Sequence, residues 1–436
     1  MPTPRPSRAR YGMLALLLAI TAVNYLDRTN LSIALPHIKE EFALSGTQEG
    51  LLLSAFSWMY VLAQLPGGWL LDRVGPKVAY GWAVLLWSLC TAALALARGF
   101  TALLGLRMAL GVAEAPAYPA NNKLVTTWFP NAERARATAV YTSGQYIGLA
   151  VALPLLSWIT VSLGWRSMFV ATGALGVVLT VVWLRRAHED PRRHPKANAA
   201  ELDLLDAGTT APRPRTRPTW RDVGYLLSRR RLWGMYVSQF CTNGVMWFFL
   251  TWFPSYLTDA KHISLLDAGF LAAVPYLAAL AGVLLSGYWS DRMLRRGVSP
   301  TAARKTPIMI GFVLSGVIVA ANYTDAPGLV IAVMSLAFFA QGMSAIGWTL
   351  ASEIAPLRML GLSGGVFNFF TNLGGAVCPL VIGVILDRTG SFDAALLFVC
   401  ALAAVGLLAY VFLLDRVERL PGRAGVTAPA RSGPGG

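Results

Sequence analysis

Long apolar segments recur from one end of this chain to the other, and they constrain its fold more than any other feature. We count twelve, and each is as long as the roughly 17 to 25 residues that a helix needs to cross a bilayer. A backbone inside lipid must satisfy its own hydrogen bonds, as a helix does. The segments are predicted at 12–35, 48–71, 78–97, 101–122, 137–160, 166–184, 232–257, 266–289, 307–323, 328–350, 362–385 and 392–414. The sequence therefore predicts an all-α membrane protein with twelve transmembrane helices.

The composition excludes the main soluble alternatives. Only 14% of the residues are charged, against roughly 25% in ordinary soluble domains, whereas 55% are hydrophobic. A soluble enzyme, a disordered chain and a secreted disulfide scaffold are excluded on this ground. The cysteines lie inside apolar segments without C-x-x-C spacing, and the histidines show no metal-ligand spacing. We therefore expect no metal site and no cofactor.

The basic residues are distributed unevenly among the loops. Of 37 Lys and Arg, 30 lie at the termini and in the even-numbered loops, 5 lie in or beside the odd-numbered loops, and 2 lie inside segments. This asymmetry follows the positive-inside rule and predicts cytoplasmic termini. The net charge of +15 is then a consequence of topology, so we expect no nucleic-acid partner.

A repeat relates two halves of the chain. The longest loop, 185–231, carries 12 basic residues and one short helical stretch at 199–207, and we interpret it as a mostly flexible cytoplasmic linker beside anionic lipid headgroups. On either side of it, Gly68–Arg73 after the second segment matches Gly287–Arg292 after the eighth. Such halves place a binding site between them, near the middle of the membrane. The predicted organisation is an N-terminal six-helix bundle, a linker, and a C-terminal six-helix bundle with its cytoplasmic tail, at 1–184, 185–231 and 232–436.

Four charged residues lie deep inside the segments: Asp27, Arg28, Arg107 and Glu114. Each costs roughly 2.5–3.5 kcal/mol at a helix centre on insertion scales, so function is favoured over a purely structural role. An arginine binds a carboxylate through two parallel hydrogen bonds, so Arg28 and Arg107 are candidate ligands of an anionic substrate. The carboxyl groups of Asp27 and Glu114 are candidates for proton coupling. Because adjacent helical residues point about 100° apart, we expect Asp27 and Arg28 to face different neighbours, one of them toward the substrate.

The second half offers neutral groups where the first half is charged. Gln341 and Trp348 repeat the seven-residue spacing of Arg107 and Glu114. This asymmetry fits a ligand with an anionic end and a hydroxyl-bearing body. The residues expected to line it are Tyr60, Gln145, Trp348 and Asn372, for which helix packing and interhelical hydrogen bonds are the alternatives.

Charged residues at the cytoplasmic ends of helices are candidates for gate contacts that break when the site opens. They belong to the repeated loops after the second and eighth segments. Solvated charge that only sets the topology is the alternative. These residues are Asp72, Arg73, Lys77, Asp291 and Arg292.

Several motifs resemble one known family. Gly67–Lys77 is similar to the loop signature of the major facilitator superfamily, and Gly287–Arg296 repeats it more weakly. Asn24–Leu31, Gly111–Pro116 and Thr251–Leu257 resemble its anion:cation symporter branch. That branch includes bacterial permeases for galactonate, glucarate, hexuronates and some aromatic acids, and the animal sialic-acid and vesicular glutamate transporters.

The resemblance covers nearly the whole chain and implies residue roles as well as a fold. By it, Asp27 and Glu114 are the protonation sites, Arg28 binds the substrate carboxylate, and Arg107 couples to Glu114. We therefore hypothesise a proton-coupled symporter of an organic anion that works by rocker-switch alternating access in a bacterial inner membrane. A sugar acid (an aldonate, aldarate or hexuronate such as galactonate) is the first candidate substrate.

Other functions are weighed against this hypothesis. An aromatic-acid or dicarboxylate permease, or an anion exchanger of the same fold, is the alternative among transporters. An intramembrane enzyme or a receptor is disfavoured, because no histidine lies deep in a segment and no signalling domain is attached. The expected partners are the anion, protons and membrane lipid, and the expected functional unit is a monomer.

Overall fold

The computed structural model describes residues 6–207, 220–356 and 359–421, where all regular structure is helical. The first group of helices is α1 (Ala9–Phe42), α2 (Gly46–Val74), α3 (Pro76–Leu94), α4 (Phe100–Glu114), α5 (Ala117–Trp128), α6 (Asn131–Leu163) and α7 (Trp165–Arg186). The loop that follows contains η1 (Pro191–Arg193), α8 (Ala199–Ala207) and α9 (Trp220–Leu227). The second group is α10 (Arg230–Thr251), α11 (Phe253–Ser255), η2 (Tyr256–Ala260), α12 (Leu265–Arg295), α13 (Pro300–Ser315), η3 (Gly316–Tyr323), α14 (Pro327–Gly342), η4 (Met343–Ile346), α15 (Gly347–Ile354), α16 (Leu360–Thr389), α17 (Phe392–Leu408) and η6 (Ala409–Leu413).

Within the described residues, ten helices are long and apolar enough to cross a membrane. The two remaining predicted segments, 48–71 and 232–257, lie on α2 and on α10 with its continuation. Several helices extend past their predicted segments, as α1 does at Ala9–Phe42 against 12–35. Hydropathy misses such ends because the terminal turns are polar although backbone hydrogen bonding continues through them. The all-α fold class is confirmed.

Local sequence explains where the chain turns and where helices break. Gly75 and Gly164 adopt positive φ angles of 86° and 84°, so the chain reverses directly between α2 and α3 and between α6 and α7. Pro116 separates α4 from α5, because a proline donates no backbone hydrogen bond to the preceding turn. Ser45 begins α2 with a reciprocal capping box that involves Gln48.

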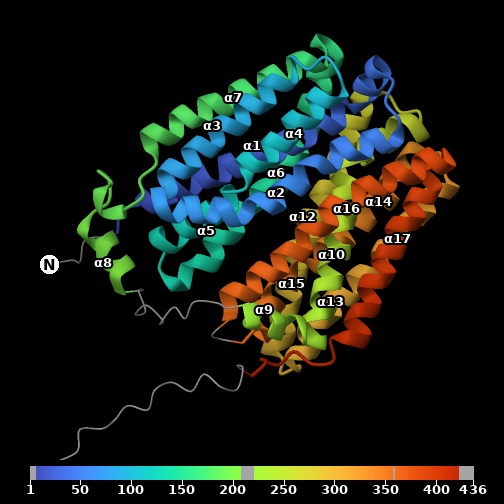
Figure 1. The fold of residues 1–436 in the computed structure, drawn as a ribbon. Coiled ribbons are helices and arrows are strands. Elements are labelled where there is room, and N and C mark those ends of the chain that lie inside the picture. The colour runs from blue at the N-terminus through green and yellow to red at the C-terminus, as the bar shows by residue number, and fades with distance from the viewer. Residues whose placement is uncertain (1–5, 208–219, 357–358, 422–436) are drawn as a thin grey trace, which may run out of the picture.

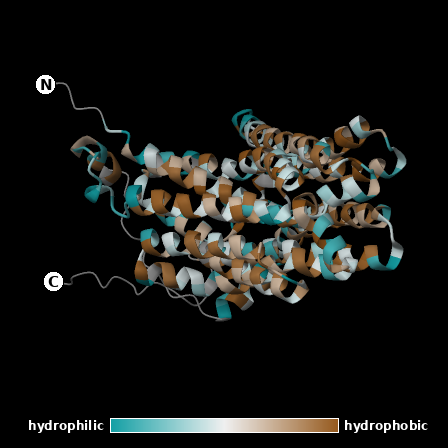
Figure 2. Cartoon of the chain, turned by 90° about the horizontal axis from the view of Figure 1, so that it is seen from above, coloured by the Kyte–Doolittle hydropathy of each residue, from teal (hydrophilic) through white to brown (hydrophobic). Residues whose placement is uncertain are grey.

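The helices form two bundles, α1–α7 and α10–α17 (Figure 1). Figure 1 shows that the bundles meet at one end and lie apart at the other, where α8 and α9 are found. We call the latter the linker end and the former the far end. Hydrophobic residues cover the length of the helices, and hydrophilic residues gather at their ends (Figure 2).

Glycines bring helices close together in the same way in both bundles. A Cβ atom on Gly148 of α6 would lie 2.5 Å from the carbonyl oxygen of Ala22 on α1. A Cβ atom on Gly374 of α16 would lie 2.2 Å from the carbonyl oxygen of Phe240 on α10. Small residues at these contacts allow the close helix approach that membrane bundles use.

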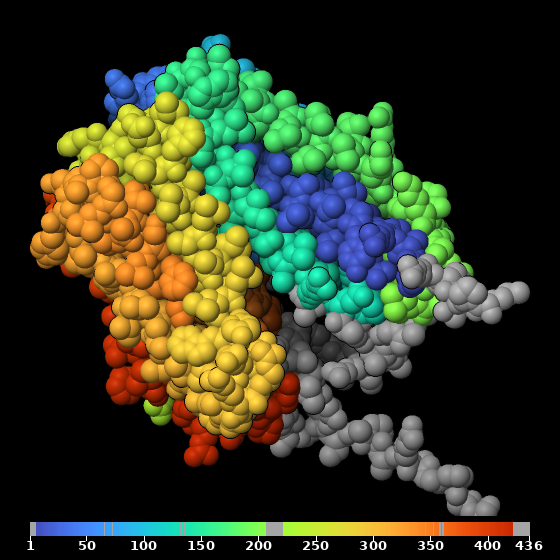
Figure 3. Space-filling model, turned by 180° about the vertical axis from the view of Figure 1, so that it is seen from behind, coloured from blue at the N-terminus to red at the C-terminus, as the bar shows by residue number. Residues whose placement is uncertain are grey.

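The two bundles are joined through α2 with α16 and α6 with α12. Near the far end, Gly46 and Gly50 of α2 meet Gly383 of α16 with no room for side chains. Figure 3 shows the resulting seam between the halves and a hollow between them toward the linker end. Within this arrangement α1 contacts α2 and α10, and α2 contacts α4.

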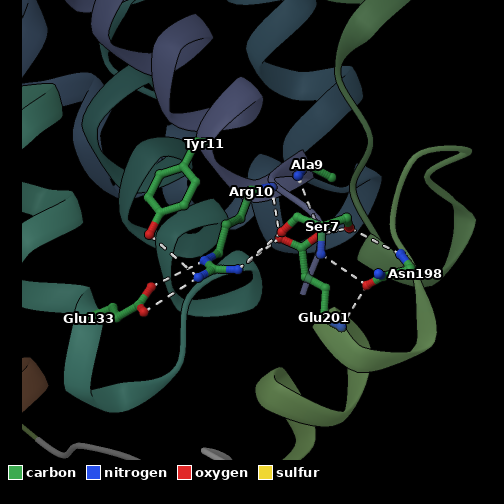
Figure 4. Close-up of polar contacts among 7 residues, drawn as sticks. All are labelled: Ser7, Ala9, Arg10, Tyr11, Glu133, Asn198 and Glu201. Atoms are coloured by element: carbon green, nitrogen blue, oxygen red, sulfur yellow. Dashed lines mark hydrogen bonds and ion pairs between the residues drawn. The ribbon is translucent and has the colours of Figure 1, made fainter. Parts of the chain in front are cut away.

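The first part of the linker is docked on the first bundle (Figure 4). Glu201 of α8 is fully buried and accepts hydrogen bonds from the backbone N–H groups of Ala9 and Arg10 at 3.3 and 3.2 Å. Arg10 also forms ion pairs with Glu201 at 3.0 Å and with Glu133 of α6 at 3.1 Å. Glu201 therefore caps the start of α1 and compensates the positive charge of Arg10.

The linker differs from the sequence expectation in two respects. The expected helix at 199–207 is present as α8, and its Glu201 carboxylate is bonded to the start of α1, so this part of the linker packs on the first bundle. A second helix, α9, is also present, and its Tyr225 hydroxyl donates to the carbonyl oxygen of Pro421 at 2.6 Å. Residues 208–219 of the expected linker lie outside the described residues.

Candidate functional site

A buried ion pair joins α1 to α4 in the middle of the first bundle. Nε of Arg28 donates to Oε2 of Glu114 at 3.0 Å, and both side chains are almost wholly buried. Two aligned charges at this distance largely compensate each other, whereas either charge alone in an apolar interior would be strongly destabilising. Glu114 is therefore held by an arginine of another helix, and Arg107, two turns earlier on the same face of α4, is not its hydrogen-bond partner.

Aromatic rings surround the Arg28 guanidinium group. Its central carbon lies 4.8 Å from the ring centroids of Tyr25 and Phe56, and 5.0 Å from that of Tyr60. Rings at this distance attract a cation through their π faces. The Nη2 atom of Arg28 has no hydrogen-bond partner among the described residues. A planar cation with a free donor, walled by flat rings, is a suitable receptor for a carboxylate.

Asp27 points away from this aromatic wall. Its side chain is fully buried, and neither carboxyl oxygen has a hydrogen-bond partner among the described residues. It interacts electrostatically with Glu114 and Arg107 and lies beside Thr91 of α3. The turn of about 100° between neighbouring helical residues thus sends Asp27 into the bundle and Arg28 toward α2.

Arg107 completes the set of four charges. It is fully buried, its central carbon lies 5.6 Å from the ring of Phe56, and its three guanidinium nitrogens lack hydrogen-bond partners in the described chain. It interacts electrostatically with Glu114, Asp27 and Arg28. Two cations and two carboxylates thus share one interior, so a proton or an anion added to any of them changes the balance for all.

The other expected substrate residues lie on α2, α6, α15 and α16. Tyr60 stacks on Phe56 at 5.5 Å between ring centroids. Gln145 accepts a hydrogen bond from the Tyr118 hydroxyl at 3.4 Å. Trp348 of α15 is about half exposed (47%) and lies edge-on to a phenylalanine of α16.

A chain of amides crosses from one bundle to the other. Asn372 donates to the side-chain oxygen of Asn368 at 3.1 Å, and Asn368 donates to Oε1 of Gln64 on α2 at 2.8 Å. Trp247 of α10 also meets the first bundle, with its ring stacked on Phe56 at 6.1 Å. Both halves therefore contribute polar and aromatic groups near Arg28.

The expected gate residues lie at the linker end, and their contacts in the described chain stay within one bundle. Asp291 accepts from Arg304 of α13 at 3.2 Å, and Arg304 also pairs with Glu353 at 2.9 Å. Arg292 donates to the Tyr288 hydroxyl at 3.1 Å.

In the first bundle, Arg73 lies over the ring of Trp69 at 5.2 Å. Lys77 is partly buried, and its carbonyl oxygen accepts from Trp183. The side chain of Asp72 lies outside the described residues.

Contacts at the far end join the halves and were missed by sequence reasoning. Asp387 of α16 accepts from the backbone N–H groups of Gly46 and Thr47, at 2.6 and 2.7 Å, and from the Thr47 hydroxyl. Lys39 pairs with Glu49 at 3.0 Å and lies 3.9 Å from Asp259 of the second bundle. Other missed residues are Tyr25, Phe56, Tyr118, Trp247 and Arg304. A signal for two of them was present in the sequence: Tyr25 stands three positions before Arg28, and Phe56 stands four positions before Tyr60. Each spacing places the two residues of the pair on one helix face.

Two bundles of apolar helices around a buried, charged and aromatic site define a multi-pass membrane transport protein. The chain belongs to the Major Facilitator Superfamily, whose family model matches residues 17–303 and 262–433. This membership confirms the resemblance drawn from the motifs, and the family consists of transporters and not of enzymes.

Curated relatives match over nearly their whole length. The D-galactonate transporter of Escherichia coli O6:H1 is 44% identical over 95% of this chain and 98% of that protein. A probable galactarate/D-glucarate transporter of Bacillus subtilis is 40% identical over 96% of this chain and 95% of its own. A probable L-galactonate transporter of Escherichia coli K12 is 34% identical over 94% and 90%.

Solved structures share the fold. A bacterial homologue of the human lysosomal transporter Spinster, in an inward-facing and unoccupied conformation, superposes with a TM-score of 0.75 at 19% identity, over 95% of this chain and 99% of that chain. A D-xylose–proton symporter superposes with a TM-score of 0.72 at 14% identity, over 94% and 99%.

Proposed function

We propose that this protein is a proton-coupled symporter of a sugar acid, with D-galactonate as the first candidate substrate. The observation that carries the proposal is the Arg28–Glu114 pair beneath the rings of Tyr25, Phe56 and Tyr60. Arg28 offers its free donor edge to a substrate carboxylate, and the rings shape the space beside it. Galactonate and galactarate transporters among the relatives support this substrate class.

The rest of a sugar acid needs hydrogen-bonding groups and flat surfaces. Gln145 and Asn372 offer amides, and Tyr60 and Trp348 offer aromatic rings. The amides hydrogen-bond the hydroxyl groups of a sugar acid, and the arginine binds its carboxylate. An aromatic acid lacks those hydroxyl groups, so the site distinguishes the two classes. Galactarate and D-glucarate, which carry a second carboxylate, are the next candidates.

Proton coupling follows from competition for one cation. A substrate carboxylate that binds Arg28 displaces Glu114, and the displaced carboxylate then favours a proton because it has lost its partner. Asp27 lies within electrostatic reach of both Glu114 and Arg107, so its protonation depends on the same event. In this mechanism Asp27 and Glu114 couple the proton, and Arg107 stabilises whichever carboxylate is charged.

We further propose twelve spans, with the linker end in the cytoplasm of a bacterial inner membrane. The division into 1–184, 185–231 and 232–436 then makes each bundle a rigid half that rocks about the central site. The hollow toward the linker end is the cytoplasmic exit in this state. The residues Asp72, Arg73, Lys77, Asp291 and Arg292 close that end in the opposite state, and the functional unit is a monomer in contact with lipid and protons.

Uptake by the purified protein in proteoliposomes tests the function. Labelled D-galactonate is offered with and without an imposed inward proton gradient, beside galactarate, D-glucarate, a hexuronate, an aromatic acid and a dicarboxylate. We expect a sugar acid to accumulate above its outside concentration only when the gradient is present. Accumulation of none of the sugar acids, or exchange of anion for anion with no response to the gradient, would contradict the proposal.

A further inference from the structure

Several buried polar side chains gather inside the first bundle. On α1 they recur at every third residue, Thr21, Asn24, Asp27 and Asn30, and each is at most 2% exposed. Neither polar atom of Asn24, Asp27 or Asn30 has a hydrogen-bond partner among the described residues. A buried polar group without a partner costs about 1–3 kcal/mol, so packing alone gives no reason to keep this series.

Polar groups of α3 and α5 enter the same interior. Thr91 lies beside Asp27. Asn121 of α5 donates to Oγ1 of Thr21 at 3.2 Å, and its own oxygen has no partner in the described chain. The Tyr80 hydroxyl, four residues after the start of α3, is fully buried and interacts with Asn121.

These groups follow one another along the helix axes. At a rise of 1.5 Å per residue, Asn24 and Thr21 lie about 4.5 and 9 Å nearer the linker end than Asp27. Asn121 lies about 10 Å nearer that end than Glu114, because α4 and α5 run toward it. The set thus leads from the two buried carboxylates toward the linker end without leaving the bundle.

We propose that this set is a proton release path from Asp27 to the linker end, separate from the route of the substrate between the bundles. It rests on the proposed function, because it requires proton symport. The Asp27 carboxyl group gives its proton to a water molecule, which becomes hydronium, and the carboxylate remains behind. The amides of Asn24 and Asn121 orient the water, and the hydroxyls of Thr21 and Tyr80 each accept one proton and donate another.

Asp27 is the group that titrates in this path, and the amides and hydroxyls are positioning residues. The charged groups that face Asp27 are Glu114 and Arg107, with Arg28 next to them. Because the substrate binds at Arg28, whose side chain leaves α1 about 100° away from that of Asp27, the proton and the anion leave by different routes. Loss of the path should therefore slow proton release and leave substrate binding unchanged.

The test removes polar groups, hydroxyls in one variant and an amide in the other, with little change in side-chain size. Thr21→Val and Tyr80→Phe are combined in one variant, and Asn121→Leu is a second. The matched controls are Thr180→Val and Tyr276→Phe, whose buried hydroxyls donate to backbone carbonyls of α7 and α10. Each protein is measured for D-galactonate affinity, for exchange of labelled against unlabelled substrate, and for uptake driven by a proton gradient.

We expect both path variants to lose at least fivefold in driven uptake, with affinity and exchange within twofold of the wild type. The controls should match the wild type in all three measurements. Unchanged driven uptake in both path variants, or an equal loss of exchange, would overturn the path. Absence of driven uptake in the wild type itself would instead overturn the proposed function.

Discussion

Arg28 contacts two kinds of group at one place, a carboxylate of α4 and aromatic rings of α1 and α2, and its Nη2 atom has no hydrogen-bond partner in the described chain. The geometry of its guanidinium group therefore matters as much as its charge. A planar guanidinium group can form two parallel hydrogen bonds with one carboxylate, either that of Glu114 or that of a ligand, whereas an ammonium group presents a single point charge.

We predict that Arg28→Lys loses substrate affinity and uptake by about tenfold or more. The lost parallel hydrogen bonds and ring stacking are each worth on the order of 1 kcal/mol, and 1.4 kcal/mol corresponds to a factor of ten. Binding and uptake of D-galactonate measure the effect. Arg166→Lys is the matched control, because that arginine pairs with Glu41 at the far end, outside the site. Affinity near that of the wild type would show that only the charge of Arg28 matters.

We also predict that Asp27→Asn and Glu114→Gln separate binding from coupling. An amide resembles a protonated carboxyl group in shape but cannot release a proton. Both variants should bind substrate and fail to accumulate it under a proton gradient, and substrate exchange should survive in one of them. Proteoliposomes with and without the gradient measure this. Concentrative uptake by both variants, with protons as the sole driving force, would show that neither carboxylate is a coupling site.

At the scale of helices, the seam at the far end depends on a cap supplied by the other bundle. The N-terminus of α2 receives the carboxylate of Asp387 from α16, in addition to its own Ser45 cap. A carboxylate is favoured there by the free N–H groups and by the positive end of the helix dipole. Because cap and helix belong to different halves, the bond must break whenever the far end opens.

We predict that Asp387→Ala shifts the protein toward a state open at the far end. Loss of such a cap is worth about 1 kcal/mol, which is roughly a fivefold change in an equilibrium. The matched control is Asp325→Ala, an acid at the same end that pairs with Lys261 inside one bundle.

Spin labels at the exposed residues Leu96 and Tyr323 report the distance between the halves at this end. The longer-distance population should grow in Asp387→Ala and stay unchanged in the control. An equal change in both variants would indicate a general effect of charge and would contradict the proposed cap.

The docked linker provides an element that responds to pH. The Lys196 backbone N–H donates to Nδ1 of His194 at 3.2 Å, which requires a neutral ring. Burial, and then the neighbouring His188, lowers the pKa of His194 below its ordinary value of 6.5. The unfolded segment therefore takes up the proton first, so docking is strongest above about pH 6.5 and weakens as the pH falls toward the lowered pKa.

We predict that the amides of α8 exchange with solvent faster at about pH 5.5 than at about pH 7.5, after correction for intrinsic exchange. Hydrogen exchange followed by mass spectrometry measures this. In His194→Gln the difference should be reduced. A pH response of the same size in that variant would show that another group causes it.

At the scale of the whole molecule, the two ends of the transporter differ in charge and in openness. Most of the basic residues belong to the linker end, where the two bundles lie apart. At the far end the two bundles meet along the seam. If the linker end is cytoplasmic, as the distribution of Lys and Arg predicts, the hollow faces the cytoplasm.

We predict that this orientation can be read from two single cysteines on a cysteine-free background. Lys196→Cys lies in the linker, and Tyr323→Cys lies at the far end, where the tyrosine is 86% exposed. A membrane-impermeant maleimide should label the second in intact cells and the first only after permeabilisation. Labelling of Lys196→Cys in intact cells would show that the linker lies outside the cell and would contradict the predicted topology.

The sequence by itself determined the properties that depend on short stretches of chain. Apolar length predicted the helices, and the resemblance of the motifs predicted the family. The four charges at 27, 28, 107 and 114 stood out because lipid makes charge costly wherever it occurs. None of these conclusions required knowledge of which helix lies beside which.

Only the tertiary structure decided which side chains meet. Glu114 shares a helix face with Arg107, yet it bonds Arg28, because seven residues separate the first pair by about 10 Å along the axis whereas α1 brings Arg28 to 3.0 Å. Asp387 caps a helix that begins 341 residues earlier in the chain, and Glu201 caps another 191 residues away. Such contacts depend on the rotation and depth of each packed helix, and these are set by the fit of all neighbouring side chains together, which no local pattern contains.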